Sequence, residues 1–293
     1  MAVNKLQWDV LVLDLDGTLL CSQGAVSDQN LHALDVVRDH GVEVVVATGR
    51  CFAESKHILE TINHIGASIT AGGSQLTDHH GNVIARDGVD ASIVSEVTKK
   101  VVEYGHRSLL LKDATTCDAQ YVLVGDAALH EASTWWFDSH EISIVEVNTF
   151  EEDPWPEHTM RVGAVANESC LIPIANELKI SLEGRAKMQH WSAVTCSEAT
   201  GSSTHLLEVF GSQVNKWTML KHHLGDLIDN ARIVAIGDGL NDVEVLQEAG
   251  LSIVMENANE HVQQHADVLA GHHNEHGFAK AMRRWIIPVE SKR

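Results

Sequence analysis

The apolar run from Val10 to Leu13 ends directly at Asp14. Four consecutive apolar residues suit a strand that is buried on both faces, as the strands of a parallel sheet are. Two further runs, Val42 to Ala47 and Ile233 to Ile236, also stop at polar residues. Helical patterns separate such runs over the first ninety residues and again near the C-terminus. This strand–helix–strand order predicts an open α/β sheet.

Residues 86–199 follow a different pattern. Helix-like stretches (91–103, 127–137 and 168–179) are separated there by β-like runs, and we find no metal or phosphate motif among them. A chain of 293 residues is long enough for two domains. We therefore predict a core domain formed by residues 1–85 and 200–293, with residues 86–199 inserted into it as an α+β domain.

Composition excludes several classes of partner. The 21 Lys and Arg against 41 Asp and Glu give a net charge of −20, which repels nucleic acid backbones and anionic membrane surfaces. No apolar run approaches the length of a membrane span, and the N-terminus does not resemble a signal peptide. The five cysteines are dispersed and form no CxxC pair, as is typical of reduced thiols. We expect a cytoplasmic protein that binds neither nucleic acid nor membrane.

Polar residues of related chemistry follow three of the predicted strands. They are Asp14 and Asp16 after the first, Thr48-Gly49-Arg50 after the second, and Asp238, Asn241 and Asp242 after the late strand. In an open α/β sheet, ligands bind outside the carboxyl ends of the strands, so we expect these residues to converge. Four carboxylates in one crevice repel each other, and oxygen ligands favour Mg²⁺ over zinc or copper.

Each group also has a purely structural interpretation. Asp-Gly is a turn signal, and Thr48 and Asn241 could each serve merely as the cap of the helix that follows. Because all three groups stand at strand ends, we favour a shared site over three unrelated local structures.

The motifs themselves resemble a known family. The segments VLDLDGTLL, VVVATGR, a lysine and IGDGLNDVEVL are similar, in order, to the four motifs of the haloacid dehalogenase superfamily. The DxDGT form resembles the Mg²⁺-dependent phosphatases of that superfamily. Residues 69–74, 255–258 and 267–277 are similar to segments of its Cof-type group, and the insertion has the place of a C2-type cap. The resemblance covers about 1–84 and 200–293, and implies a Rossmann-like, doubly wound parallel sheet.

The resemblance also implies roles for individual residues. Asp14 would be the nucleophile that forms an aspartyl phosphate, and Asp16 would protonate the leaving alcohol and later deprotonate water. The phosphoryl group would be bound by the N–H groups of Leu15 to Thr18, the Thr48 hydroxyl and the Gly49 N–H. Asn241 would orient the same group or Asp16. Arg50 would reach the substrate or form a salt bridge to a core carboxylate.

Mg²⁺ would be bound by the Asp14 and Asp238 carboxylates and the Asp16 backbone carbonyl, with Asp242 holding a metal-bound water or Lys216. Lys216 is our candidate for the family's lysine. It lies in QVNKW, where the family has G-V-[SN]-K-G, so Gln213 and Trp217 depart from the pattern, as Gly72 does from the family's Asn. Lys221 and Lys187 are the alternatives.

These features predict a Mg²⁺-dependent phosphatase with an aspartyl-phosphate intermediate, acting as a monomer or homodimer on a small phosphorylated metabolite. We expect a sugar phosphate, with flavin mononucleotide and pyridoxal phosphate as alternatives. A phosphomutase of the same fold would need a basic cap, whereas Asp and Glu outnumber Lys and Arg in residues 86–199. A non-catalytic module that binds a phosphorylated ligand is the third alternative, and the presence of both Asp14 and Asp16 argues against it.

Overall fold

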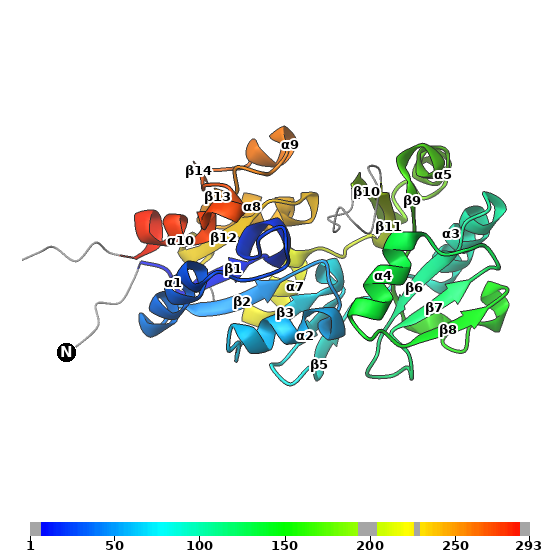
Figure 1. Cartoon of the computed structure of the whole chain (residues 1–293), viewed down its shortest axis with the longest axis horizontal. Coiled ribbons are helices and arrows are strands. Elements are labelled where there is room, and N and C mark those ends of the chain that lie inside the picture. Colours follow the sequence, from blue (N-terminus) through cyan, green and yellow to red (C-terminus); the bar gives the residue numbers. More distant parts are fainter. Residues whose placement is uncertain (1–6, 193–203, 226–228, 288–293) are drawn as a thin grey trace, which may run out of the picture. The chain divides into compact units, whose positions relative to one another are not determined.

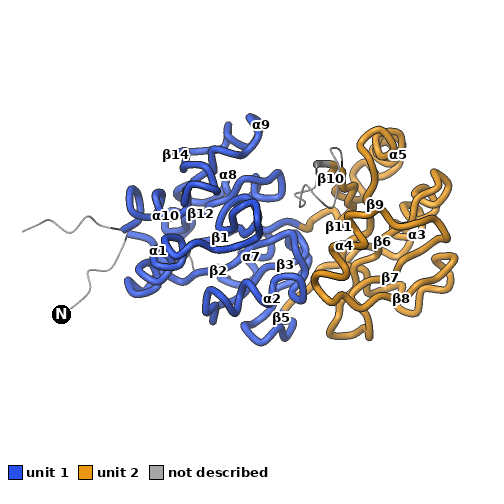
Figure 2. The backbone as a smooth tube through the Cα atoms, viewed as in Figure 1, with its two compact units in different colours: residues 1–84, 215–293 blue, residues 85–214 orange. Residues whose placement is uncertain are grey.

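The computed structural model describes residues 7–192, 204–225 and 229–287, and Figure 1 shows their course. The chain divides into two compact units. Unit 1 comprises residues 1–84 and 215–293, and unit 2 comprises residues 85–214; Figure 2 shows them in different colours. Each unit is built around its own sheet. Within the described ranges, no helix is long and apolar enough to span a membrane.

Unit 1 contains an eight-stranded sheet with the order β14-β13-β12-β1-β2-β3-β4-β5. Its strands from β14 to β3 are parallel, and β4 pairs with β3 in antiparallel orientation. The strands are β1 (Val10–Leu13), β2 (Glu43–Ala47), β3 (Ser68–Thr70), β4 (Gln75–Thr77), β5 (Val83–Arg86), β12 (Ile233–Gly237), β13 (Leu251–Val254) and β14 (Val268–Leu269).

Helices cover both faces of this sheet (Figure 1). The side chains of β1 point alternately to the two faces, and Leu11 and Leu13 pack in one buried cluster with Leu34 and Phe278. Leu34 belongs to α1 (Asp28–Asp39) and Phe278 to α10 (Gly277–Ala281), and these helices contact each other. The remaining helices are α2 (Phe52–Thr61), α7 (Lys216–Leu224), α8 (Val243–Glu248) and α9 (Glu260–Gln263). This arrangement confirms the predicted doubly wound α/β fold.

Unit 2 contains a six-stranded sheet with the order β10-β11-β9-β6-β7-β8, in which only β7 and β8 pair in parallel. The strands are β6 (Ser108–Lys112), β7 (Tyr121–Val124), β8 (Ile144–Val147), β9 (Thr159–Asn167), β10 (Ala186–Ser192) and β11 (Thr204–Gly211). α3 (Ala91–Glu103) and α5 (Glu168–Ser181) pack over one face, around Leu110, Val122 and Val162. Tyr121 points to the other face, where it contacts Phe137 of α4 (Glu131–Ser139).

The second domain boundary differs from the prediction. Residues 204–214, which the sequence analysis assigned to the core, belong to unit 2 because β11 lies between β9 and β10. Its residues Leu207 and Val209 complete the apolar face under α3 and α5. The predicted boundary itself, between residues 199 and 200, lies outside the described residues. The strands β4, β5 and β14 were also not predicted.

Candidate active site

Three neighbouring parallel strands place the predicted residues at one edge of the sheet. Asp14, Thr48 and Asp238 directly follow β1, β2 and β12, and β1 lies between the other two. The Asp14 N–H donates to the carbonyl of Ile236 at 3.1 Å, which ties the end of β1 to β12. The carboxyl ends of parallel strands meet at one edge, so chain segments more than 200 residues apart become neighbours there.

Gly17 lets the chain turn sharply after Asp14. Asp14 and Asp16 have extended backbone angles, whereas Gly17 has a φ of +75°. A Cβ at position 17 would overlap the carboxylate of Asp238. Glycine is therefore required both for the left-handed conformation and for the close approach of Asp238 to the turn. Leu15, predicted to bind phosphate through its N–H, has a fully buried side chain in the core of unit 1.

A buried lysine joins two of the carboxylates. Nζ of Lys216 donates to Oδ1 of Asp14 at 2.7 Å and to Oδ1 of Asp242 at 2.6 Å, and all three side chains are buried. The other oxygen of Asp242 accepts from the N–H groups of Asp238 and Gly239, at 3.1 and 2.9 Å. Asp242 thus fixes Lys216 and the start of the loop after β12 at the same time.

Two glycines and a helix cap fix the position of Lys216. Lys216 is the first residue of α7, and the side chain of Asn215 caps the helix by accepting from the Thr218 N–H at 2.7 Å. A Cβ at Gly73, whose φ is +111°, would overlap the backbone of Asn215. The turn after β3 therefore lies directly against the start of α7. A Cβ at Gly237 would likewise overlap Asp242.

The second aspartate of the DxDGT motif is held by arginine. Asp16 accepts two hydrogen bonds from Arg50, from Nε at 2.7 Å and from Nη2 at 2.6 Å. Of the two predicted roles for Arg50, substrate contact and a salt bridge, the structure contains the salt bridge. The Arg50 N–H also donates to the Thr48 hydroxyl at 3.2 Å, and Thr48 is buried. Asn241 lies beside Gly49, with Nδ2 at 3.3 Å from the position of a Cβ there.

Asp238 has two polar neighbours whose side chains were not predicted to belong to the site. Thr18 Oγ1 donates to Oδ1 of Asp238 at 3.0 Å, and Asn257 Nδ2 donates to Oδ2 at 3.1 Å. The Asn257 amide also donates to the carbonyl of Gly17 at 2.9 Å. Both residues lie in segments that carried the family resemblance, which is the signal that could have identified them.

Burial and crowding of negative charge shift the pKa values of the site. Burial raises the pKa of Asp14 well above its usual range; Lys216 opposes this shift, while Asp242 and Asp238 add to it. Burial and then the Asp242 carboxylate raise the pKa of Asp238 to about 7. Burial disfavours the ammonium form of Lys216, but Asp14 and Asp242 outweigh this effect and raise its pKa. One lysine therefore does not balance the negative charge of these carboxylates.

The donor set fits a hard divalent cation. Carboxylate oxygens of Asp14, Asp238 and Asp242 lie within 4.8 Å of one another, and they form the single such acidic or His/Cys cluster within the described ranges. Oxygen ligands with unbalanced negative charge are the chemistry that Mg²⁺ prefers. The side chain of Asp16 is not part of this cluster.

Of the two candidate lysines in unit 1, only Lys216 contacts these carboxylates in the described part of the chain. Lys221, one turn further along α7, lies over the ring of Trp217, with Nζ at 5.6 Å from the centroid. Lys187 lies on β10 of unit 2.

The chain is similar to several known proteins. The chain is 26% identical over 292 residues to 5-amino-6-(5-phospho-D-ribitylamino)uracil phosphatase YcsE of Bacillus subtilis, covering 98% of this chain and 100% of that protein. It is 25% identical to the HMP-PP phosphatase of Yersinia pseudotuberculosis, covering 93% of each chain. The crystal structure of a haloacid dehalogenase-like hydrolase from Bacteroides thetaiotaomicron superimposes with a TM-score of 0.76 at 23% identity, covering 94% of this chain and 99% of that one.

The family model of haloacid dehalogenase-like hydrolases matches residues 11–282, which is nearly the whole chain. The match spans β1 to α10 and includes every predicted site residue. The predicted resemblance and enzyme class are thereby confirmed, and the chain belongs to the haloacid dehalogenase-like hydrolases.

Proposed function

We propose that this hydrolase is a Mg²⁺-dependent phosphatase that acts on monoesters of small phosphorylated metabolites. The observation that carries the proposal is the state of the buried Asp14 carboxylate. Its Oδ1 accepts from Lys216, whereas we find no other hydrogen bond to this side chain among the described residues. One oxygen is thus fixed and the other is available to attack phosphorus.

In the first step, Oδ2 of Asp14 would form a bond to phosphorus as the bond from phosphorus to the leaving alcohol breaks. Asp16 would give its proton to the alcohol oxygen. In the second step, Asp16 would take a proton from water, and the water oxygen would displace Asp14 from phosphorus. The products are the alcohol and inorganic phosphate, and both aspartates return to their initial states.

The other residues would bind and orient. Lys216 opposes the rise in the pKa of Asp14 and fixes one of its oxygens by a hydrogen bond of 2.7 Å. Arg50 holds the Asp16 carboxylate by two hydrogen bonds, so Asp16 must exchange this pairing for the leaving oxygen when it transfers a proton. Thr48, Gly49 and Asn241 lie together at the end of β2 and would donate to the phosphoryl oxygens.

The residues that would hold Mg²⁺ are Asp14, Asp238 and the backbone carbonyl of Asp16, with Asp242 holding Lys216 in place. When bound, the ion supplies the positive charge that allows an anionic nucleophile to approach an anionic ester. The raised pKa values of Asp14 and Asp238 support this proposal, because a cation would relieve the charge that causes them.

For the substrate, we propose a sugar phosphate or a related small metabolite. The two curated relatives are named for small phosphorylated metabolites, and the name of one includes a phosphorylated ribityl chain. The net charge of −20 does not favour nucleic acid or membranes as partners. We expect a monomer or a homodimer.

The decisive experiment is hydrolysis of p-nitrophenyl phosphate by the full chain, with Mg²⁺ and with excess EDTA. We expect turnover that requires Mg²⁺, with little activity in EDTA and recovery when Mg²⁺ is restored. Full turnover in EDTA would contradict metal dependence. If the protein shows no turnover with Mg²⁺ and none in EDTA, the result would favour a non-catalytic binding module. A screen of phosphorylated metabolites would then test the preference for sugar phosphates.

A further inference from the structure

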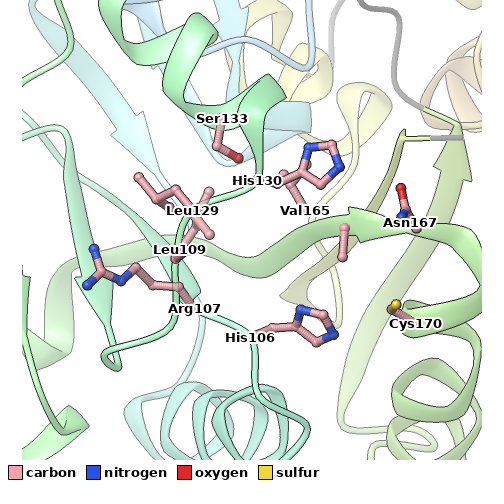
Figure 3. Close-up of a pocket in the computed structure, with 11 residues that line it drawn as sticks. His106, Arg107, Leu109, Leu129, His130, Ser133, Val165, Asn167 and Cys170 are labelled. Atoms are coloured by element: carbon pink, nitrogen blue, oxygen red, sulfur yellow. The ribbon is translucent and has the colours of Figure 1, made fainter. Parts of the chain in front are cut away.

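Unit 2 contains a cavity of about 150 Å³ that the proposed chemistry does not use. Figure 3 shows its lining, which comes from the start of β6, the end of β9 and the first turns of α4 and α5. The polar side chains that line it include His106, His130, Ser133 and Asn167. No aspartate or glutamate belongs to the lining among the residues that the structure describes.

Two helices begin at this cavity. His130 is the residue before α4, which has nine residues, and Asn167 is the residue before α5, which has fourteen. The side chain of Asn167 makes no capping hydrogen bond to α5. The N–H groups in the first turn of a helix carry partial positive charge and suit a negatively charged ligand. Two such ends at one cavity therefore favour an anion.

A buried hydroxyl supplies independent evidence for a ligand. Ser133 is 4% exposed, and its Oγ has no hydrogen-bond partner. Figure 3 shows this hydroxyl pointing from α4 toward the side of the cavity where His130 lies. A buried hydroxyl without a partner is costly, so a ligand that accepts its hydrogen bond would stabilise this arrangement.

The two histidines offer further donors. Nδ1 of His130 accepts from the Ala132 N–H at 3.2 Å, so the proton of the neutral ring is on Nε2, which is left as a donor. We find no hydrogen bond to the His106 ring within the described ranges. Burial and the nearby His130 lower the pKa of His106. Arg107 points away from both rings and pairs with Glu146.

We propose that this cavity binds a small oxoanion, either a phosphate or a carboxylate, through Ser133, His106, His130 and the first turn of α5. The site lies within unit 2, shares no residue with the candidate active site, and does not depend on the proposed phosphatase activity. The site would bind an anion even though the protein as a whole carries a net charge of −20.

Cys170 provides a local readout, because it lines the cavity and is exposed. We would measure alkylation of Cys170 in the full chain by iodoacetamide, a neutral reagent, using mass spectrometry of its peptide. Inorganic phosphate and malate would be titrated separately, against NaCl at equal ionic strength. We expect at least one of the two to slow the alkylation of Cys170 several-fold. Cys21 of unit 1 is the internal reference and should not respond.

Two substitutions test the assignment. Ser133→Ala removes a donor that has no partner in the protein, so it should not lower stability, yet it should raise the anion concentration for half-protection about tenfold. His130→Asn keeps a capping oxygen for α4 but shortens the donor, and should weaken protection similarly. Ser139→Ala, at the last residue of α4, is the matched control and should leave protection unchanged.

The two anions distinguish the possible ligands. Protection by phosphate alone assigns the cavity to phosphorylated compounds, and protection by malate alone assigns it to carboxylates. The site does not exist as proposed if neither anion protects Cys170 beyond NaCl. It is equally ruled out if the anion protects Cys170 in Ser133→Ala and in His130→Asn as well as it does in the wild type. Phosphate inhibition of p-nitrophenyl phosphate hydrolysis should stay unchanged in both variants, which separates this result from binding at the active site.

Discussion

At the scale of single residues, Asp14 combines burial, a fixed oxygen and a free oxygen. Asp14→Asn keeps the volume and can still accept from Lys216, but it removes the nucleophile and a negative charge. We expect kcat for p-nitrophenyl phosphate to fall by about 10³-fold or more, while the melting temperature is maintained. The control is Asp35→Asn on the exposed side of α1, which should change neither quantity. Near-normal kcat in Asp14→Asn would refute the role of this residue.

Lys216 is the only positive partner of Asp14 and Asp242 among the described residues. Lys216→Met would leave both carboxylates buried without their cation, and we expect the free energy of unfolding in urea to fall by about 3–5 kcal/mol. Mg²⁺ should recover part of this loss, because binding to the native state alone stabilises it. Lys221→Met, one turn further along α7, is the matched control and should cost far less. Equal losses in the two variants would contradict the central position of Lys216.

At the scale of elements, the position of α7 depends on the turn after β3. Gly73→Ala would add strain at a φ of +111° and push its Cβ into the backbone of Asn215. We expect the free energy of unfolding to fall by about 2–5 kcal/mol, together with kcat, because Lys216 is displaced. Gly24 has a similar left-handed φ of +73°, but a Cβ there would meet no neighbour. Gly24→Ala should therefore cost only about 1–2 kcal/mol and leave kcat unchanged.

His64, in the connection between α2 and β3, makes stability depend on pH. Burial, and to a lesser extent Arg38, lower the pKa of His64 to about 4. Between about pH 6.5 and 4 the unfolded chain binds a proton at this residue that the native state does not, so acid destabilises the fold. The full effect is about 3 kcal/mol. In His64→Gln, the free energy of unfolding relative to wild type should rise as pH falls from 6.5 to 4. A difference that does not vary with pH would disprove this contribution.

At the scale of the whole molecule, the residues assigned to phosphoryl transfer all belong to unit 1, whereas unit 2 is one continuous insertion. The two ends of the insertion lie side by side, since a Cβ at Gly211 would be 2.7 Å from the carbonyl oxygen of Gly88. Residues 85–214 can therefore be replaced by the corresponding unit of a related phosphatase without moving the ends of unit 1.

We expect such an exchange to change the order of preferred substrates, because a separate unit can contact the leaving group and exclude water. Mg²⁺ dependence and the requirement for Asp14 should persist. The measurement is kcat/KM for a panel of phosphate monoesters, with circular dichroism to show that the chimera is folded. A folded chimera with an unchanged order of substrates would place specificity in the loops of unit 1.

Much of the fold and several members of the site could be predicted from local patterns. The runs that form β1, β2 and β12 are apolar throughout because both faces are covered, and each stops at the polar residues that end the strand. The helix predicted over residues 91–103 is found at these residues as α3. Asp14, Thr48 and Asp238 could be placed at one edge because parallel strands bring their carboxyl ends together.

The sequence by itself determined most of the elements, the fold class and the chemical types of residue at the edge of the sheet, because hydrophobic period and strand ends are local properties. Tertiary structure alone decided which groups touch. The choice of Lys216 over Lys221, the pairing of Arg50 with Asp16 and the membership of β11 in unit 2 depend on contacts between distant segments. The bond from Lys216 to Asp14 spans 202 residues of sequence. Its geometry is set by packing of α7 against Gly73, which no local pattern encodes.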